Sequence, residues 1–278
     1  MYKYSFLESC LFLPTYLNEK KLQNSLQGKT VLITGATSGI GEQLAYNLAE
    51  VNCYVILVGR REEKLLTMKQ DMEKHAALVG TYRADLRNKE EIEGLLEFLK
   101  NLPNGLDFIV SNAGHSIKRS INDSLDRYHD FTRTMAINYF APVQLLLSVI
   151  PLLKKSKGQI INVSTINTLL SPMSHFAAYQ ASKTACDVWL RSVAPELKEA
   201  GITTTTIYLP LVKTPMIQPT TAYRNMPAMS TDHVAKIICK YMYKRKKKYQ
   251  PWWLLFGRIL SIFLNDIPFY SVAKRSKK

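Results

Sequence analysis

The sequence predicts a doubly wound α/β fold of the Rossmann-like type, with one parallel sheet covered by helices on both faces. Three observations predict it. Short β-branched runs alternate with helical stretches, a glycine-rich turn joins the first run to a helix, and polar motifs follow the ends of the runs. We expect a single domain over 28–248, with an N-terminal extension 1–27 and an apolar, basic C-terminal segment 249–278.

Length and composition fit a folded protein with a full core. The chain has 278 residues, of which 46% are hydrophobic, and its four cysteines are scattered without metal-binding spacing. We therefore expect reduced thiols and no metal site. The net charge of +15 is concentrated at one end, because 244–278 holds ten Lys and Arg residues against one acid. A basic tail favours an anionic surface as partner over nucleic acid.

The elements are predicted in an alternating order. The predicted strands are 30–34, 54–58, 79–83, 107–111, 159–163 and 203–209. The predicted helices are 42–50, 62–75, 88–101, 124–155 and one that carries Tyr179 and ends near 200. Pro142 is a candidate kink in the fourth helix, and Pro151 lies near its end.

The turn after the first strand is the first candidate site. Residues 34–41 read Thr-Gly-Ala-Thr-Ser-Gly-Ile-Gly, which gives the spacing G-x-x-x-G-x-G. Glycines let the backbone approach a pyrophosphate, and a helix N-terminus favours its charge. The alternative is a tight turn with only a structural role. We favour a nucleotide site because a strand and a helix flank the turn.

A pair of arginines follows the second strand. An acidic residue at this place would bind the ribose 2′-hydroxyl, whereas arginine accommodates a 2′-phosphate. Arg60, with Arg61 beside it, therefore favours NADP over NAD. The alternative is a solvated pair that opens the charged helix 62–75.

Tyr179 and Lys183 are spaced to meet on one face of a helix. A cation beside a phenol favours the phenolate, so we expect Lys183 to lower the pKa of Tyr179 from its usual ~10. Such a Tyr could exchange a proton with an alcohol or a carbonyl. Taken alone, the pair is equally typical of a solvated helix surface.

Together these motifs resemble the short-chain dehydrogenase/reductase family over about residues 28–245. The matching elements, in order, are the glycine turn, Asn112-Ala113-Gly114, Asn138, Ser164-Thr165 and Tyr179/Lys183. The resemblance implies Tyr179 as general acid or base, Lys183 on the nicotinamide ribose, and Asn138 in support of a water relay. The implied NADP(H) contacts are Gly35, Thr37, Ser38, Gly39, Ile40, Gly41, Arg60, Arg61, Asp85 (at the adenine), Leu86, Asn112, Ala113, Gly114, Tyr179, Lys183, Val212 and Thr214.

Two positions depart from the family pattern. The family has a second, catalytic Ser after the fifth strand, and Thr165 stands there. Ser164 and Thr165 both stay candidates for the catalytic hydroxyl, and we favour Thr165, whose hydroxyl can still donate to a carbonyl. Pro210 stands where the family has Gly, which restricts the backbone of the pocket wall.

A narrower resemblance, to the reductase domain of bacterial fatty acyl-CoA reductases, rests on residues 112–121, 128–131 and 209–216. It implies a carbonyl on an apolar, acyl-derived substrate. His115, Lys118 and Arg119 could meet an anionic carrier or form a solvated basic loop. Residues 213–230, rich in Met and Pro, are the expected substrate lid.

Both ends of the chain carry apolar residues outside the expected domain. Residues 251–264 are apolar, contain two Trp and lie between basic residues, but are too short to span a bilayer. We expect either a helix in an anionic membrane interface or one packed over the pocket or a subunit interface. Residues 1–27 do not resemble a signal peptide and are expected to be a short amphipathic or docking segment.

The sequence thus predicts an NADP(H)-dependent short-chain oxidoreductase that interconverts a carbonyl and an alcohol. The direction stays open. The alternative is a non-catalytic protein that senses NADP(H) or scaffolds a lipid complex. We expect a cytoplasmic protein with a peripheral place at a membrane, and the resemblance implies a homodimer or homotetramer.

Overall fold

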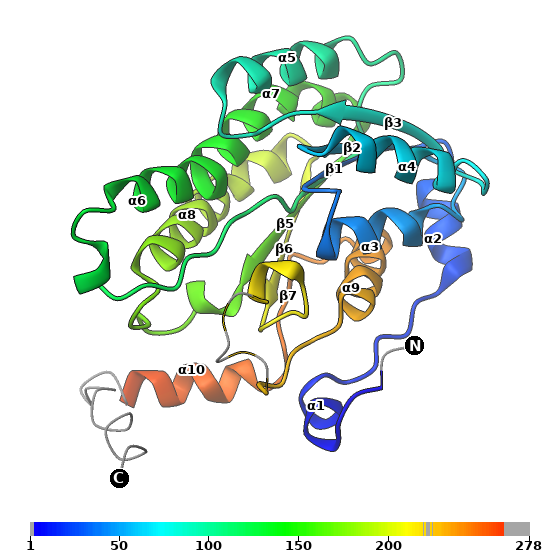
Figure 1. Ribbon diagram of the computed structural model, residues 1–278. Coiled ribbons are helices and arrows are strands. Elements are labelled where there is room, and N and C mark those ends of the chain that lie inside the picture. The colour runs from blue at the N-terminus through cyan, green and yellow to red at the C-terminus, as the bar shows by residue number, and fades with distance from the viewer. Residues whose placement is uncertain (1–2, 219, 221–222, 224, 264–278) are drawn as a thin grey trace.

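The computed structural model describes residues 3–218, 220, 223 and 225–263 and contains one seven-stranded parallel sheet (Figure 1). The strand order is β3-β2-β1-β4-β5-β6-β7, so the predicted doubly wound α/β fold is confirmed. The strands are β1 Thr30–Thr34, β2 Tyr54–Gly59, β3 Leu78–Arg83, β4 Phe108–Ser111, β5 Gln159–Thr165, β6 Thr203–Leu209 and β7 Lys248–Tyr249.

The centre of the sheet lies between β1 and β4. The chain builds outwards from β1 to β2 and β3, then returns to β4 and builds the other way. All five residues of β1 are buried, because helices cover both faces of the strand. The reversal leaves a crevice at the carboxyl ends of β1 and β4, where ligands of such sheets bind.

Two layers of helices cover the sheet. One apolar cluster holds residues of α2 (Glu19–Leu26), α3 (Gly39–Leu48), α4 (Glu62–Met72) and α9 (Thr231–Lys244). The other holds residues of α5 (Lys89–Lys100), α7 (Ala141–Ser156) and α8 (Ala177–Glu199). Helices α1 (Phe6–Leu11) and α10 (Leu254–Phe263) lie at the lower edge of the molecule in Figure 1.

The N-terminal extension is part of this body. Leu22 and Leu26 of α2 are buried in the first cluster, against α9. The sequence interpretation predicted neither α1, α2 nor α9, and it missed the two-residue edge strand β7. The apolar spacing of α9 was present in the sequence, with Val234, Ile238 and Met242 on its buried face.

The long helix predicted over 124–155 is corrected at its start and in its middle. Residues Asn122–Ser124 form a separate 3-10 turn, and the helix begins with α6 (Tyr128–Met135). A π-helical turn, Ala136–Phe140, then leads into α7, whose second residue is Pro142. Because Pro142 has no N–H to donate, the helix widens just before it rather than kinking after it.

The combined helix Tyr128–Ser156 is also long and apolar enough, by length and composition, to cross a membrane. Core helices of globular proteins meet the same criterion. Leu145, Leu146 and Val149 of this helix are buried in the second apolar cluster.

Candidate active site

A cleft of about 760 Å³ opens at the carboxyl ends of the central strands. It brings together nearly every residue that the sequence predicted for the site. Three predicted residues lie outside its lining: Gly41, Arg61 and Asn138. The cleft also contains a set of apolar side chains that the sequence interpretation assigned only by range, among them Met216 of the expected lid.

The glycine turn forms one end of the cleft. Gly35 and Gly39 have left-handed backbones, with φ of 65° and 57°. A Cβ on Gly41 would lie 2.4 Å from the Gly35 carbonyl oxygen, and one on Gly39 would lie 3.0 Å from the Thr214 methyl. A side chain at Gly39 or Gly41 would therefore collide with neighbouring atoms, and Gly39 and Ile40 of the first turn of α3 line the cleft.

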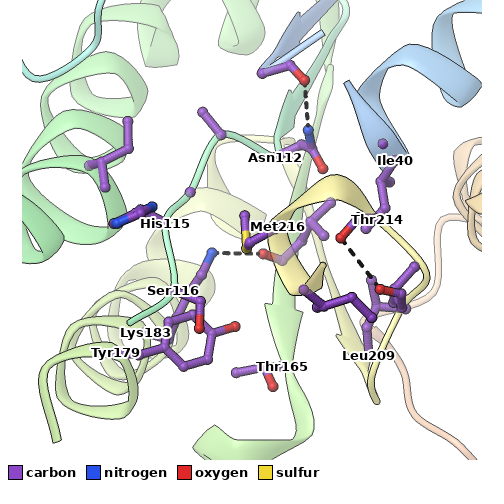
Figure 2. A pocket seen from close by; sticks show the side chains of 18 of the residues that line it. Ile40, Asn112, His115, Ser116, Thr165, Tyr179, Lys183, Leu209, Thr214 and Met216 are labelled. Carbon is purple, nitrogen blue, oxygen red and sulfur yellow. Dashed lines mark hydrogen bonds between the residues drawn. The ribbon is translucent and has the colours of Figure 1, made fainter. Parts of the chain in front are cut away.

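Asn112 ties this turn to the next strand, as the resemblance implied. Its Nδ2 donates to the Thr34 carbonyl at 2.9 Å, while its own N–H and that of Ala113 donate to the Thr34 hydroxyl. These bonds link the carboxyl ends of β1 and β4. Figure 2 shows Asn112 beside Ile40 at this end of the cleft. The floor of the cleft is thereby fixed by backbone and short side chains.

The arginines after β2 have different surroundings. Arg60 lines the cleft, is largely exposed, and lies 3.9 Å from the Asp85 carboxylate. Arg61 reaches away from the cleft and donates to the Thr37 carbonyl of the glycine turn. Arg61 thus braces the turn, and Arg60 is the arginine free to meet a ligand phosphate.

Asp85 carries a partner that the sequence interpretation missed. Arg87 Nε donates to Asp85 Oδ1 at 2.9 Å, and the ion pair holds the pKa of Asp85 below its usual range. With Arg60 and Arg87 beside one carboxylate, this end of the cleft has a net positive charge. The spacing Asp-x-Arg was visible in the sequence, but nothing there indicated that the two side chains pair.

Tyr179, Thr165 and Lys183 meet at the other end of the cleft (Figure 2). The Thr165 and Tyr179 hydroxyls line the same part of the cleft, and Thr165 opposes the rise in the pKa of Tyr179. Lys183 Nζ donates to the Val163 carbonyl at 3.2 Å. The loop between β5 and α8 is held by Gln180, whose amide accepts from Met173 N–H and donates to the Asn167 carbonyl. Gln180 therefore sets the distance between strand and helix, a role that the sequence interpretation missed.

The expected lowering of the Tyr179 pKa is corrected by the structure. Burial raises the pKa of Tyr179 to about 12, although the hydrogen bond with Thr165 opposes this. Burial also lowers the pKa of Lys183. The spacing prediction assumed solvated, charged neighbours, whereas both groups lie in a cleft that disfavours their charged forms. In this state Tyr179 is a proton donor at neutral pH, not a phenolate.

The two candidate hydroxyls at the end of β5 are now distinguishable. The Thr165 oxygen accepts from Asn167 N–H at 3.3 Å, and Thr165 acts on the pKa of Tyr179. The Ser164 oxygen is buried and has no hydrogen-bond partner among the described residues. Of the two hydroxyls, Thr165 is thus the one that interacts with Tyr179.

Asn138 lies in the π-helical turn and supports the site from behind. Its Oδ1 accepts from His115 N–H at 2.9 Å, and its Nδ2 donates to the His115 carbonyl and to Ser182 Oγ. A Cβ on Gly114 would meet both Asn138 Oδ1 and Lys183 Nζ, so Asn138 and Lys183 flank the same glycine. Asn138 joins three elements that carry site residues.

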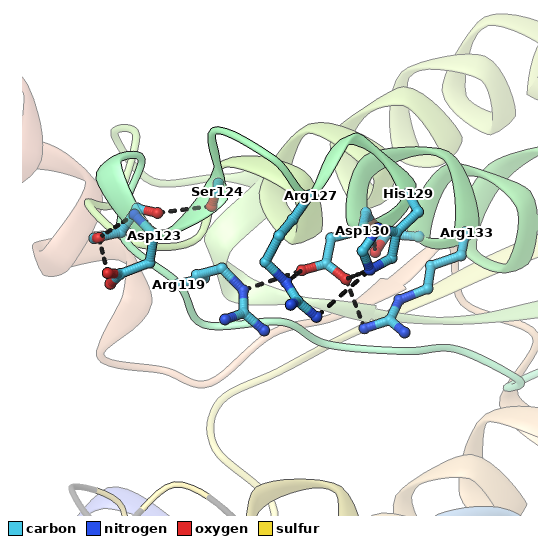
Figure 3. A network of polar contacts seen from close by, with 9 residues as sticks. Arg119, Asp123, Ser124, Arg127, His129, Asp130 and Arg133 are labelled. Atoms are coloured by element: carbon cyan, nitrogen blue, oxygen red, sulfur yellow. Dashed lines mark hydrogen bonds and ion pairs between the residues drawn. The ribbon is translucent and has the colours of Figure 1, made fainter.

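A charged network holds the rim of the cleft near α6 (Figure 3). Asp130 is almost fully buried and is paired with Arg119 at 3.0 Å, Arg127 at 3.3 Å and Arg133 at 2.7 Å. One carboxylate thus gathers three guanidinium groups, and Arg133 lines the cleft. The basic loop noted in the sequence is therefore an ordered, net positive rim.

Comparison with known proteins identifies the class. The family described as short chain dehydrogenase matches residues 29–225. The chain is 39% identical to a fatty acyl-CoA reductase of Acinetobacter baylyi over 231 residues, which cover 83% of this chain and 78% of that protein. It is 37% identical to a fatty acyl-CoA reductase of Mycobacterium tuberculosis, over 76% of this chain and 72% of that protein.

Solved structures show the same fold. A short-chain dehydrogenase from Sphingobium yanoikuyae in complex with NADPH superposes with a TM-score of 0.73 at 21% identity, over 87% of this chain and 97% of that one. A 3-oxoacyl (acyl-carrier-protein) reductase from Agrobacterium tumefaciens with NADP bound gives 0.70 at 23%, over 80% and 90%. The chain belongs to the short-chain dehydrogenase family, and it is an oxidoreductase of that family.

Proposed function

We propose that the protein transfers hydride between NADP(H) and a carbonyl or alcohol on an apolar, acyl-derived substrate. The observation that carries the proposal is the Tyr179–Thr165 pair at the opposite end of one cleft from the glycine turn and Arg60. The residues present fit the cofactor. The glycine turn has room for a pyrophosphate only because its glycines carry no Cβ atoms. Arg60 places a cation where a 2′-phosphate would lie.

The nicotinamide ring supplies the hydride when it is bound. The chain's own residues do the rest. Tyr179, kept protonated by burial, gives its proton to the carbonyl oxygen, and Thr165 holds that oxygen and Tyr179 in one hydrogen-bonded group. Lys183, Val212 and Thr214 line the wall where the nicotinamide and its ribose would rest. Gly35, Ser38 and Ile40 line the phosphate end.

The lining of the substrate side supports an apolar substrate. Several apolar side chains line the same cleft as Tyr179, namely Leu170, Met173, Phe176, Met216 and Met226. Methionine side chains adapt to flexible apolar chains. The two reductases of fatty acyl-CoA among the relatives agree with this chemistry.

A carbonyl panel tests the proposal. Purified protein is given NADPH or NADH with aldehydes, ketones and thioesters of increasing chain length. Substitution Tyr179→Phe removes the proton donor and should lower kcat/KM by about 10³-fold or more. Tyr128→Phe, on an exposed side chain, is the matched control. Unchanged NADPH oxidation in Tyr179→Phe would remove Tyr179 from the mechanism and favour a protein that only binds the cofactor.

We also propose two features of the assembly. The C-terminal segment 249–278 lies against an anionic membrane surface, since α10 buries Leu254 but exposes Leu255, Phe256 and Ile259. Residues 264–278 lie outside the described part of the chain.

The second feature is a homodimer or homotetramer. Apolar side chains exposed on the long helices support it, namely Phe140 in the π-helical turn, Leu147 in α7 and Val188 in α8. Sedimentation of the full chain without lipid measures the second feature.

A further inference from the structure

The N-terminal segment holds both ends of the expected lid, residues 213–230. Glu8 of α1 is buried, and its Oε1 lies 2.7 Å from Lys213 Nζ at the start of the lid. The same oxygen accepts from Ala228 N–H, near the end of the lid, at 3.2 Å. Burial opposes ionisation, but the bonds from Lys213, Ser5 and Ala228 win and lower the pKa of Glu8 to about 2.

Further bonds strengthen this attachment. The Tyr4 hydroxyl accepts from Ser230 N–H at 2.9 Å and lies 3.1 Å from His233 Nδ1. The Thr15 hydroxyl lies 3.0 Å from the other ring nitrogen of His233. Residues 4–15 therefore lie across the point where the lid joins α9, with their polar groups turned inwards.

The outer side of the same segment is apolar and exposed. Phe6 is 88% exposed, Leu7 56%, and Tyr16 82%. Trp252 Nε1 donates to the Cys10 carbonyl at 3.2 Å, which joins this segment to the start of α10. We define the terminal face as Phe6, Leu7, Leu13, Tyr16, Trp252, Leu255, Phe256 and Ile259, all of which are at least half exposed.

The charges around the terminal face have one sign. Within 3–16 and 252–259 the only acid is Glu8, which is buried and paired with Lys213. Lys3 and Arg258 are exposed in the same segments. The sequence beyond, 264–278, holds four Lys and Arg residues against one acid. Apolar side chains flanked by cations complement an anionic lipid surface, and the next acid along the chain, Glu19, lies in the first turn of α2.

We infer that both ends of the chain form a single lipid-docking surface, the terminal face, and that an anionic bilayer is its partner. The inference rests on the proposed membrane association of the C-terminal segment and extends it to the first sixteen residues. Because residues 4–15 hold both ends of the expected lid, docking brings that lid close to the lipid surface. The face inserts shallowly, since neither α1 nor α10 is long enough to span.

Vesicle flotation tests the inference with the full chain. The vesicles are phosphatidylcholine with and without phosphatidylglycerol. The variant Phe6→Ser with Leu7→Ser alters exposed side chains only. The matched control, Leu66→Ser with Leu78→Ser, removes two exposed leucines from α4 and β3. We expect the first variant to lower the bound fraction on anionic vesicles at least about fivefold and the control to leave it unchanged.

A third variant, Leu255→Ser with Phe256→Ser, separates the two proposals. If only this α10 variant loses binding, the C-terminal proposal stands and the composite face is wrong. If the wild-type chain does not float with anionic vesicles, both are wrong. If the N-terminal variant instead changes the sedimentation coefficient without lipid, the face is a contact between copies, and the lipid inference is overturned. Carbonyl reduction measured in parallel shows whether the enzyme itself is intact.

Discussion

The two ends of the cleft are built in opposite ways. The cofactor end consists of backbone and short side chains from the buried strands β1 and β4, where Asn112 bonds to Thr34 and Gly41 touches Gly35. The other end lies beside the expected lid, residues 213–230. It consists of long side chains, and the chain's first residues contact it, as Glu8 does. The first end tolerates no added atom, whereas the second depends on distant partners. Substitutions should therefore cause large losses of cofactor affinity at the cofactor end and small changes in KM beside the lid.

Among the substitutions that compare the two ends, the largest effect is expected at the glycine turn. Gly41→Ala would place a methyl 2.4 Å from the Gly35 carbonyl, a contact that only a backbone shift can relieve. We expect NADPH affinity to fall about 100-fold or more, measured by fluorescence titration, with Tm recorded alongside. Gly257→Ala, whose added Cβ meets nothing within 4 Å, is the control. A dissociation constant within twofold of the wild type would contradict a rigid cofactor end.

The next effect concerns the hydroxyls after β5, at the end of the cleft opposite the glycine turn. Thr165→Val removes the hydroxyl that acts on Tyr179 while keeping the shape of the side chain, and kcat/KM should fall about 100-fold. Ser164→Ala removes a buried hydroxyl that has no partner among the described residues, so kcat/KM should change less than about threefold. The reverse order in steady-state assays would make Ser164 the catalytic hydroxyl.

Cofactor choice should respond more moderately. Arg60→Ala removes the cation that lines the cleft beside Asp85, so the ratio of kcat/KM with NADPH to that with NADH should drop about tenfold. Arg61→Ala serves as the comparison, because Arg61 binds the Thr37 carbonyl instead of lining the cleft. It should lower affinity for both cofactors alike. An unchanged NADPH preference in Arg60→Ala would assign the 2′-phosphate to another group, Arg87 being the nearest candidate.

The smallest effect is expected at the lid. Glu8→Gln keeps the shape of the side chain but removes its charge beside Lys213. KM for a long-chain carbonyl should rise about threefold while the NADPH dissociation constant stays unchanged. A change in NADPH affinity of the same size would show that α1 acts on the whole fold and not on the lid.

The same variant has a pH signature. The pKa of Glu8 is lowered in the folded protein to about 2 from an ordinary value of 4.5. A lowered carboxyl pKa stabilises the fold above the unfolded value and loses that contribution as the pH falls through the folded value. The difference in Tm between wild type and Glu8→Gln should therefore be constant above about pH 5 and vanish between pH 4.5 and about 2.

The comparison also explains what could be predicted from the sequence. Glycine spacing, Asn112 and the Tyr179/Lys183 pair are local patterns that became specific in combination, and the six longer strands followed from β-branched runs. Two contacts could not be predicted: Arg87 pairs with Asp85, and Gln180 bonds to the loop between β5 and α8. Both depend on where side chains lie in space, which the spacing of residues along the sequence does not encode. The pKa of Tyr179 was predicted in the wrong direction because burial, not a neighbouring charge, dominates it.

The contacts of Glu8 with both ends of the expected lid affect the order in which parts of the protein fold. Glu8 and Ala228 are 220 residues apart, and Tyr4 and His233 are 229 apart. Such pairs form late, because the long loop between their members must close first. During synthesis the first residues must wait until nearly the whole chain has been made. Helix α3, which follows the glycine turn, also packs against α9, so the cofactor end and the expected lid are both completed only when residues 231–244 have been made.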